Sequence, residues 1–351
     1  MSLPARITLA IVGWLGAALA APATPVQVKV VVVAMFESGN DTGDTPGEFQ
    51  YWVEREHLER VWPLPQGYRD LRSSADGSVL GVVTGVGTAR SAATIMAVGL
   101  DPRFDLSRAY WLVAGIAGVD PHDASLGSAA WAEWLVDGDL AHEIDAREIP
   151  DDWTTGYIPI RHKKPYELPV TRDEGEAYRL NPSLVAWAYE LTKDTPLEDS
   201  GPMRLRRAGY VGFPNAQRPP FVLRGDNLAS MTYWHGARMN RWANDWVAYY
   251  SEGAGNYVTT AMEDTGTFGS LLWLERAGKV DAKRVLVLRT ASNFDMQWPG
   301  ATAAESLAGE KLGGYSAYLP ALEAAHRVGS RVVHELLRDW PRYERDIPSA
   351  P

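Results

Sequence analysis

The sequence predicts an α/β layered fold with a mostly parallel sheet, because short apolar runs alternate with helical patterns along the chain. The run VQVKVVVVAMF over Val26–Phe36 is rich in β-branched residues, which is typical of a buried central strand. The Ala-rich segment Thr88–Gly99 fits a helix packed tightly on a sheet. Asn181, Pro182 and Ser183 form a helix start, with Asn at the N-cap and Pro in the first turn.

The other expected strands are also short and apolar. They cover Ser78–Thr84, Ala109–Gly115, Ser128–Val136 and Arg284–Thr290. Runs of this length suit strands better than helices, which need about ten or more residues. The Pro-rich and charged stretch Ile149–Glu174 reads as a long connection or an insertion.

Apolar residues at helical spacing predict the remaining helices. The helix that starts at Asn181 carries Leu184, Trp187, Ala188 and Leu191 at this spacing. A second stripe consists of Trp242, Trp246, Tyr249 and Tyr250. We interpret this stripe as core, and a ligand-binding face is the alternative.

Two more helices are expected in the last third of the chain. Thr265–Ala277 ends at Gly278, a residue that suits a left-handed C-terminal cap. Pro320–Trp340 forms a long C-terminal helix. In open α/β sheets, ligands bind beyond the carboxyl ends of the strands. Four expected loops have that position: Glu37–Gly43, Gly85–Arg90, Gly115–Asp120 and Ala291–Asp295.

Composition excludes several classes of function. Of the 351 residues, 34 are Lys or Arg and 44 are Asp or Glu, which gives a net charge of −10. An acidic chain without a basic run is a poor match for a nucleic-acid backbone. Cysteine is absent, so disulfide frameworks, thiolate metal sites and cysteine nucleophiles are excluded. The 14 tryptophans suit a large aromatic core or a site that stacks a planar ligand.

The first 20 residues have the layout of a secretory signal peptide. An apolar, uncharged run over Ile7–Ala20 follows a short basic start and ends in the small-x-small pattern Ala18-Leu19-Ala20. An uncleaved anchor is the alternative, although this run is shorter than the roughly 20 residues of a spanning helix. We therefore expect a secreted or periplasmic protein with no membrane segment after cleavage, and one domain over residues 26–345.

Several segments resemble the nucleoside phosphorylase and nucleosidase superfamily. They are Thr84-Gly85-Val86-Gly87, Ala114–Val119, Met262-Glu263 and Arg289–Asn293, in this order. Over Val28–Arg338 the chain is more closely similar to the purine nucleoside permease family, including the stretches Gly225–Gly236 and Thr260–Gly266. The resemblance implies a single three-layer α/β/α domain that holds a purine nucleoside at the carboxyl edge of the sheet.

The resemblance assigns Met262 and Glu263 to the ribose. A carboxylate can accept hydrogen bonds from two vicinal hydroxyls, so Glu263 suits the 2′,3′-diol. An acidic residue at a helix start, where it interacts favourably with the helix dipole, is the alternative interpretation.

The resemblance places Asn293 beside the purine. Related nucleosidases end the corresponding Arg-x-x-Ser-Asp segment with an Asp that protonates the leaving base. The amide of Asn293 can orient a base but cannot act as a general acid. Asp295, two residues further on, is the nearest candidate acid, with a solvated loop carboxylate as the alternative.

Hydrolysis also needs a group that positions water. Related nucleosidases carry a Glu just after the first strand, and Glu37 is the candidate here, offset by one residue from the usual place. Asp41 and Asp44 in the same loop are reserves, and a polar turn without a catalytic role is the alternative for the segment.

The remaining site residues form the floor and the aromatic wall of the expected pocket. Tyr233 and Trp234 can stack on a purine. For His235, a structural imidazole and a ligand contact are equally good interpretations. The backbone expected to line the floor belongs to Thr84, Gly85, Gly87, Gly115 and Ala117.

The sequence favours water over phosphate as the nucleophile. Related phosphorylases hold phosphate with an Arg and a Ser at the positions of Val113 and Ile116, and Glu37 adds a negative charge. A phosphate dianion needs donors and positive charge, which only Arg90 could partly restore.

We therefore predict a secreted, metal-independent purine nucleosidase without a cofactor. A phosphorylase and a nucleoside-binding component for uptake are the alternatives. The seven histidines show no metal-ligand spacing, and His122, His142 and His162 are dispersed. Superfamily members are usually dimers, trimers or hexamers, so the resemblance is compatible with a homo-oligomer. The long Ile149–Glu174 stretch could block the interfaces that such oligomers use.

Overall fold

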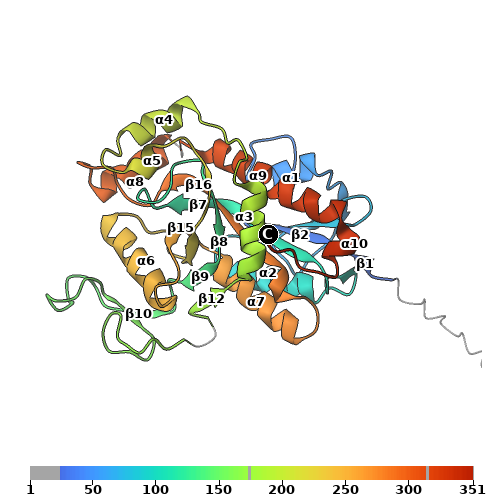
Figure 1. The fold of residues 1–351 in the computed structure, drawn as a ribbon, viewed down its shortest axis with the longest axis horizontal. Helices are drawn as coiled ribbons and strands as arrows, with labels where there is room; N and C mark the ends of the chain where they lie inside the picture. Colours follow the sequence, from blue (N-terminus) through green and yellow to red (C-terminus); the bar gives the residue numbers. More distant parts are fainter. Residues whose placement is uncertain (1–23, 173–174, 314–315, 351) are drawn as a thin grey trace, which may run out of the picture.

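The computed structural model describes residues 24–172, 175–313 and 316–350 (Figure 1). The expected signal peptide over residues 1–20 lies outside these residues, so it stays a prediction. The strands are β1 (Val26–Gln27), β2 (Val30–Ala34), β3 (Arg60–Trp62), β4 (Leu71–Ser73), β5 (Val79–Val83), β6 (Phe104–Asp105), β7 (Tyr110–Val119), β8 (Ala129–Ala132), β9 (Trp134–Asp137), β10 (Ala141–Glu143), β11 (Tyr157–Pro159), β12 (Ala177–Arg179), β13 (Val222–Arg224), β14 (Asp226–Ala229), β15 (Tyr257–Ala261) and β16 (Val285–Phe294). The helices are α1 (Gln50–Arg55), α2 (Thr88–Gly99), α3 (Pro182–Thr192), α4 (Gly201–Ala208), α5 (Pro214–Gln217), α6 (Ala237–Tyr250), α7 (Asp264–Arg276), the 3₁₀ turn η1 (Ala282–Arg284), α8 (Ala303–Gly313), α9 (Tyr318–Arg338) and α10 (Trp340–Tyr343).

One large mixed sheet organises the described part of the chain, which confirms the α/β class. Its main path runs β12-β9-β14-β15-β7-β2-β5-β4-β3, and β16 joins β7 to β8. Within the segment β5-β2-β7-β16 of the sheet, each strand is parallel to the next. Strand β4 pairs antiparallel with β5, and β12 pairs antiparallel with β9. Because β2, β5, β7 and β16 are parallel, their carboxyl ends meet at one edge of the sheet.

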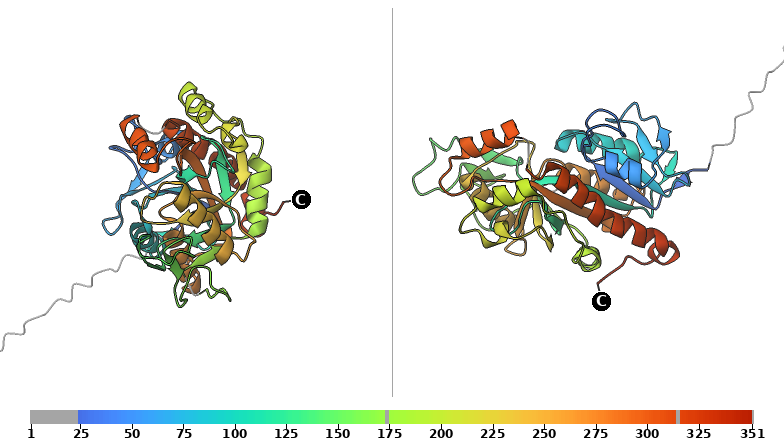
Figure 2. Two further views of the ribbon diagram at one scale, coloured as in Figure 1. Left: turned by 90° about the vertical axis from the view of Figure 1, so that its left-hand side faces the viewer. Right: turned by 90° about the horizontal axis from the view of Figure 1, so that it is seen from above.

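Helices cover the sheet in separate groups (Figure 1). The long helix α9 packs against β7 and β16, and helices α1 and α3 pack against α9. Figure 2 shows α9 running across much of the molecule. Helix α2 packs on α7, which in turn contacts β9, β12 and β14, while α6 covers β14 and β15.

The sequence located most elements correctly but placed several boundaries wrongly. Helix α2 has the expected bounds, and Asn181 caps α3 by accepting from the amides of Ser183 and Leu184. The expected strand over 26–36 is split into β1 and β2, and the strand over 128–136 is split at Glu133 into β8 and β9. The second split occurs because β8 pairs with β13 and β16, whereas β9 pairs with β12 and β14.

Two further boundaries differ near the carboxyl edge of the sheet. β7 and β16 continue to Val119 and Phe294, so most of the expected loops over 115–120 and 291–295 are strand. The reason is that the two strands remain paired along their length, with Asn293 opposite Gly118. The C-terminal helix is broken at Asp339, where α9 ends and α10 begins.

The tryptophan stripe of α6 lies in the core, as interpreted from its spacing. Trp242, Trp246, Tyr249 and Tyr250 are all buried, with Trp246 and Tyr250 fully enclosed. They pack with Trp234 and Tyr257 in one aromatic cluster. Gly278, just after α7, has the expected left-handed backbone with φ of 67°.

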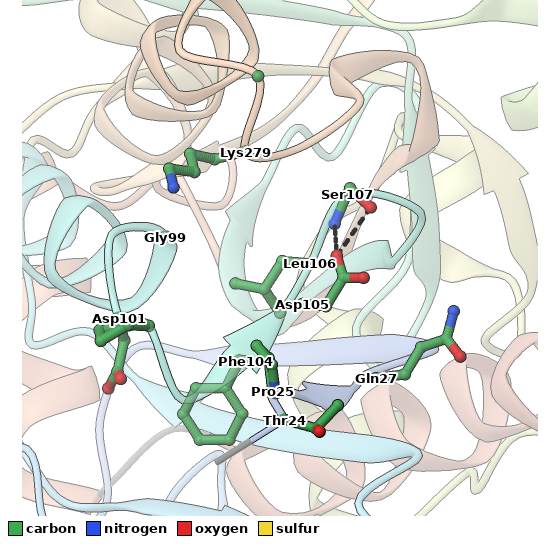
Figure 3. A pocket seen from close by; sticks show the side chains of 12 residues that line it. Thr24, Pro25, Gln27, Gly99, Asp101, Phe104, Asp105, Leu106, Ser107 and Lys279 are labelled. Carbon is green, nitrogen blue, oxygen red and sulfur yellow. Dashed lines mark hydrogen bonds between the residues drawn. The ribbon is translucent and has the colours of Figure 1, made fainter. Parts of the chain in front are cut away.

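A surface hollow of about 590 Å³ lies at the opposite edge of the sheet, where β6 leads into β7 (Figure 3). Phe104 and Leu106 form part of its wall, and Asp105 accepts hydrogen bonds from the amide and hydroxyl of Ser107. In the described residues, no helix has the length and apolar character needed to span a bilayer.

Candidate active site at the carboxyl edge of the sheet

A cavity of about 370 Å³ opens where β2, β5, β7, β15 and β16 end. Its lining combines apolar side chains with two carboxylates, one guanidinium and two phenols. The lining residues are Met35, Phe36, Glu48, Val86, Ile116, Ala117, Gly118, Tyr233, Thr260, Ala261, Met262, Glu263, Arg289, Ser292, Asn293 and Tyr318. The cavity therefore occupies the position expected for a ligand site in an α/β sheet.

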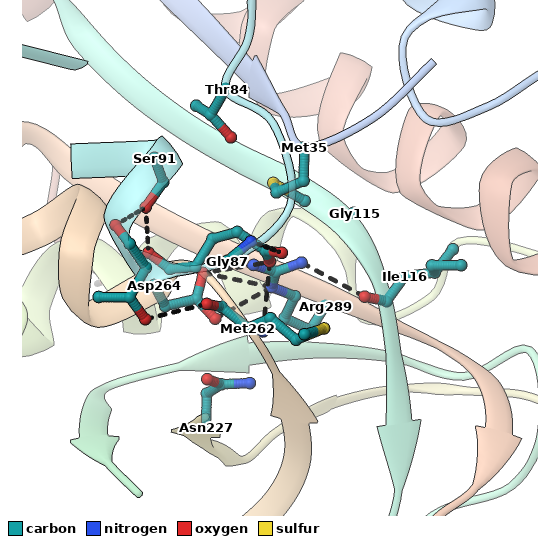
Figure 4. Close-up of polar contacts among 12 residues, drawn as sticks. Met35, Thr84, Gly87, Ser91, Gly115, Ile116, Asn227, Met262, Asp264 and Arg289 are labelled. Carbon is teal, nitrogen blue, oxygen red and sulfur yellow. Dashed lines mark hydrogen bonds and ion pairs between the residues drawn. The ribbon is translucent and has the colours of Figure 1, made fainter. Parts of the chain in front are cut away.

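A buried ion cluster forms one wall of the cavity (Figure 4). Arg289, in the middle of β16, donates to both carboxylate oxygens of Asp264 and, over 3.0 Å, to Glu263. It also donates to the carbonyl of Ile116 over 3.3 Å. Burial alone would lower the pKa of Arg289, but the two carboxylates outweigh it and raise the pKa well above its usual range. The guanidinium is therefore permanently charged and fully engaged.

Glu263 is held from three directions at the start of α7. Its carboxylate accepts from the amides of Gly87 and Met262 as well as from Arg289. Burial raises the pKa of Glu263, while the charge of Arg289 opposes that shift. Ser91 donates to the Glu263 carbonyl, so the start of α2 is fastened to the β15–α7 turn. This arrangement presents a rigid acceptor to the cavity.

Glu48 is the second carboxylate in the cavity, and the sequence did not suggest it. One of its oxygens accepts from the amide of Met35 over 2.8 Å, and the other accepts from the amide of Ile116 over 2.7 Å. The side chain thus bridges the residue that follows β2 and the second half of β7. Burial raises the pKa of Glu48 to about 8, with Arg289 lowering it and Glu263 raising it further.

A glycine makes room for Glu48. A Cβ at Gly115 would lie 2.4 Å from the nearer carboxylate oxygen of Glu48 and 1.9 Å from the Met35 side chain. Any other residue at this position would therefore displace the carboxylate. Gly115 does not line the cavity itself, but its lack of a side chain makes room for Glu48 and Met35.

Glu37, the candidate for water positioning, does not line the cavity. Its carboxylate accepts from four backbone amides, those of Ser38, Gly47, Phe49 and Gln50. The reserve Asp41 is ion-paired with Arg69 and Arg72, and the reserve Asp44 accepts from the Asn40 amide. The loop carboxylates that the sequence suggested are therefore engaged by backbone amides and by two arginines, and none of the three lines the cavity.

Asn293 and Tyr233 lie together at the other end of the cavity. The Asn293 amide nitrogen donates to the Tyr233 hydroxyl over 3.0 Å, and its oxygen accepts from Ser292 over 2.8 Å. The Ser292 contact fixes the amide orientation, so that the donor faces Tyr233. Tyr233 is 45 % exposed, which leaves a large aromatic side chain at the cavity mouth.

Asp295, the candidate acid, is buried behind the cavity lining. Its carboxylate accepts from the Tyr257 hydroxyl over 2.5 Å and from the Asn240 amide over 3.1 and 3.2 Å. Burial raises its pKa well above the usual range, and the nearby charge of Asp120 adds to this effect. The side chain is therefore a buried carboxyl group that does not reach the described lining.

Trp234 and His235 also lie outside the described lining. Trp234 is 8 % exposed and packs against Trp242 and Tyr257, so it belongs to the aromatic core. Both ring nitrogens of His235 are buried and have no hydrogen-bond partner among the described residues. Burial lowers the pKa of His235 to about 4, so the ring is neutral at pH 7.

The expected backbone floor is divided between lining and supporting residues. Ala117 and Met262 line the cavity, as expected. Gly87 lies behind them and donates its amide to Glu263, while Gly85 precedes it with φ of 81°. Thr84 is fully buried, donates to the Gly85 carbonyl and lies apart from the ion cluster in Figure 4.

Among the missed residues, Arg289 gave a usable signal. A charged side chain in the apolar strand VLVLRT is rarely buried without a partner, so it indicates an ion pair. Glu48 gave no comparable signal, because it follows β2 by fourteen residues and nothing in its local sequence distinguishes it from Glu37. Tyr318 enters the cavity from the start of α9 and donates to the Pro46 carbonyl over 3.0 Å.

Comparison of sequences relates the chain to one family. The pattern of the purine nucleoside permease family matches residues 27–348. The probable purine nucleoside permease of Schizosaccharomyces pombe is 29% identical over 284 residues, which cover 78% of this chain and 80% of the relative. The purine nucleoside permease of Candida albicans is 27% identical over 319 residues, or 90% of this chain and 76% of the relative.

Comparison of structures finds the same fold in nucleosidases. The futalosine hydrolase of Helicobacter pylori superposes with a TM-score of 0.53 at 15% identity, covering 89% of this chain and 99% of that chain. The 5′-methylthioadenosine/S-adenosylhomocysteine nucleosidase of Helicobacter pylori gives a TM-score of 0.51 at 15% identity, covering 89% and 100%. These similarities show a nucleoside phosphorylase-like fold.

Proposed function

We propose that this chain, which belongs to the purine nucleoside permease family, is a purine nucleoside N-ribosyl hydrolase that needs no metal. The observation that carries the proposal is the pair of buried carboxylates, Glu48 and Glu263, which line one cavity. One carboxylate suits a ribose diol, and the other suits a water molecule. We also propose that the protein is exported after removal of residues 1–20, and works outside the cytoplasm.

In this proposal Glu263 accepts hydrogen bonds from the 2′ and 3′ hydroxyls of the ribose. The carboxylate is anchored by Arg289 and two amides, so little entropy is lost when the diol binds. Glu48, the remaining carboxylate of the lining, holds the water that attacks the anomeric carbon. We assign this role to Glu48 in place of Glu37, because the Glu37 carboxylate is occupied by backbone amides.

The chemical step forms the C1′–O bond to water and breaks the C1′–N9 bond. The electron pair of the broken bond moves to the purine, and Glu48 takes a proton from the attacking water. The purine leaves as an anion, and the proton on Glu48 passes to it through water, which returns Glu48 to its ionised form. Base catalysis requires the ionised form of Glu48, whose pKa of about 8 makes it a strong base for a carboxylate. One N–H of the Asn293 amide donates to the Phe294 carbonyl, and the other donates to the Tyr233 hydroxyl. In this proposal the second N–H turns from that hydroxyl to the departing base and stabilises it, while the Tyr233 ring covers the face of the base.

The charge of the lining disfavours phosphate as the nucleophile. Among the described lining residues, Arg289 is the one basic side chain, and it is engaged by Glu263 and Asp264. A phosphate dianion would lie close to the Glu263 carboxylate, and the lining residues that the structure describes offer it no free cation. Water, which is neutral, meets no such barrier.

The test is to incubate the purified protein with inosine or adenosine, with and without phosphate, and to identify the products. Hydrolysis predicts free base and ribose, released at the same rate with or without phosphate. The matched variant Glu48→Gln should bind the nucleoside but release base at least about 10²-fold more slowly. Formation of ribose 1-phosphate would instead show a phosphorylase.

The nature of Asn293 favours a second candidate, a nucleoside-binding component for uptake. An amide at this position can hold a purine but cannot protonate it. The relatives that share the sequence pattern are named permeases. This candidate predicts saturable nucleoside binding by calorimetry without any release of base over hours.

A further inference from the structure

The carboxylate of Glu37 is bound to the backbone on both sides of Glu48. One oxygen accepts from the amide of Gly47, and the other accepts from the amides of Phe49 and Gln50 over 2.9 and 2.6 Å. Glu48 itself donates its amide to the carbonyl of Phe36 over 3.0 Å. The two residues that flank Glu48 are therefore tied to a residue just beyond the end of β2.

This contact needs a glycine at position 47. A Cβ there would lie 2.7 Å from the Glu37 Cα and 2.9 Å from its carboxylate oxygen. Such distances are far inside van der Waals contact, and the nearer atom is backbone, which cannot move aside cheaply. Gly47 therefore allows the loop to return to the end of β2 closely enough for Glu48 to enter the cavity.

The placement of Glu48 depends on backbone position, because its own carboxylate contacts are short. Its oxygens lie 2.8 and 2.7 Å from the amides of Met35 and Ile116, which belong to two different segments of the sheet edge. A shift of the loop backbone by about 1 Å would break at least one of these contacts, and misplacement of a reacting group on this scale can cost about 10²-fold in rate.

We infer that Glu37 is a positioning residue that fixes the water-binding carboxylate of Glu48 by anchoring the backbone at Gly47, Phe49 and Gln50. The inference rests on the proposed hydrolytic function and deepens it. It separates two tasks on one loop, with Glu37 holding the backbone and Glu48 facing the substrate. Glu37 touches neither the substrate nor the reacting water.

The test compares Glu37→Gln with two other loop variants. Glu37→Gln removes the negative charge that four amides share, and Gly47→Ala blocks the close approach while keeping that charge. Glu54→Gln is the matched control, because Glu54 tethers the same loop through the Gly43 amide and the Gln50 side chain. We expect Glu37→Gln and Gly47→Ala to lower kcat about 10- to 100-fold with KM nearly unchanged, and Glu54→Gln to stay within about twofold of wild type.

A second readout does not depend on turnover. The Glu48 carboxyl can be titrated by ¹³C NMR and assigned by its absence in Glu48→Gln. Its neighbours are Arg289, Glu263 and the Tyr318 phenol, and these stay unchanged in all loop variants. We expect a pKa near 8 in wild type and in Glu54→Gln, and a value closer to the ordinary range in Glu37→Gln, because a loosened loop admits water.

The outcomes separate this inference from the proposed function. A wild-type kcat and an unchanged Glu48 titration in Glu37→Gln would overturn the positioning role, as would an equal loss in Glu54→Gln. If wild-type protein releases no base, hydrolysis fails and the titration alone decides the positioning role. If Glu48→Gln keeps full activity, the water-binding role of Glu48 is wrong, and the titration then decides whether Glu37 anchors it.

Discussion

Arg289 donates through Nη2 to the Oε2 atom of Glu263 over 3.0 Å, and their side chains are 1 % and 5 % exposed. The same nitrogen donates to Asp264 over 2.7 Å. One guanidinium therefore balances two carboxylates at the start of α7. Because most of the Arg289 hydrogen bonds go to Asp264, the Glu263 carboxylate can still accept hydrogen bonds from a ligand in the cavity.

The variant Glu263→Gln should lose activity specifically toward substrates with a ribose diol. Each hydrogen bond to a charged group contributes about 1.5–3 kcal/mol, so losing the charge beneath two hydroxyls should lower kcat/KM for inosine about 10²-fold. The measurement is initial-rate kinetics on inosine and on 2′,3′-dideoxyinosine. The dideoxy compound serves as the control, since it lacks both hydroxyls. An equal loss on both substrates would contradict the diol role.

Arg289→Met should destabilise the fold strongly. The substitution leaves Glu263 and Asp264 buried side by side without the cation that pairs with them, and removing one partner of a buried ion pair costs about 3–5 kcal/mol. Urea unfolding followed by tryptophan fluorescence measures this loss. The exposed Arg90→Met is the control and should change the free energy of unfolding by at most about 0.5 kcal/mol. A small effect at Arg289 would mean that the carboxylates are protonated in the folded state.

The α/β class and most elements could be predicted because they depend on local patterns. The cap at Asn181, the left-handed Gly278 and the apolar run of β2 are each specified within a few residues. Element lengths were less predictable, since β16 extends to Phe294 through its pairing with β7. That pairing joins distant parts of the chain and leaves no local signal.

Site residues could be predicted where they lie at or just beyond the end of a strand. Site residues elsewhere in the chain were harder to predict. Glu263, Met262 and Asn293 line the cavity because each lies at or just beyond a strand end. The Glu37 assignment assumed the same rule, but the loop after β2 returns and brings Glu48 into the cavity instead. Trp234 was predicted to stack on the base together with its neighbour Tyr233. Its side chain is instead buried in the aromatic core.

Glu48→Gln should stabilise the protein increasingly as the pH rises from about 4.5 to 8. Between these values the unfolded chain has released the Glu48 proton while the folded chain still holds it, so wild-type stability falls with rising pH. A tenfold difference in proton affinity between the folded and unfolded chain corresponds to about 1.4 kcal/mol, and the glutamine variant cannot ionise. We expect equal stability near pH 4.5 and a gain of a few kcal/mol at about pH 8.5. Chemical denaturation at several pH values measures it, with Glu54→Gln as control.

A flat difference between wild type and Glu48→Gln across this pH range would contradict the burial of a neutral Glu48. Activity should change in the opposite sense. Because base catalysis needs ionised Glu48, kcat/KM of the wild type should rise with pH until the carboxyl is ionised near pH 8. The same protonation equilibrium thus lowers stability and increases activity as the pH rises.

Asp295→Asn should keep most of the activity, because Asp295 lies behind the cavity lining. Its carboxyl contacts Tyr257 and Asn240, and an asparagine can replace both contacts with one oxygen and one amide nitrogen. Burial raises the pKa of Asp295 well above its usual range, which favours the neutral form that an asparagine resembles. We expect kcat/KM within about threefold of wild type, whereas Asn293→Ala, on the same strand, should lose about 10- to 100-fold, because it removes the donor beside Tyr233. If Asp295→Asn loses as much as Asn293→Ala at unchanged KM, then Asp295 supplies the proton to the leaving base and the buried position must open during turnover.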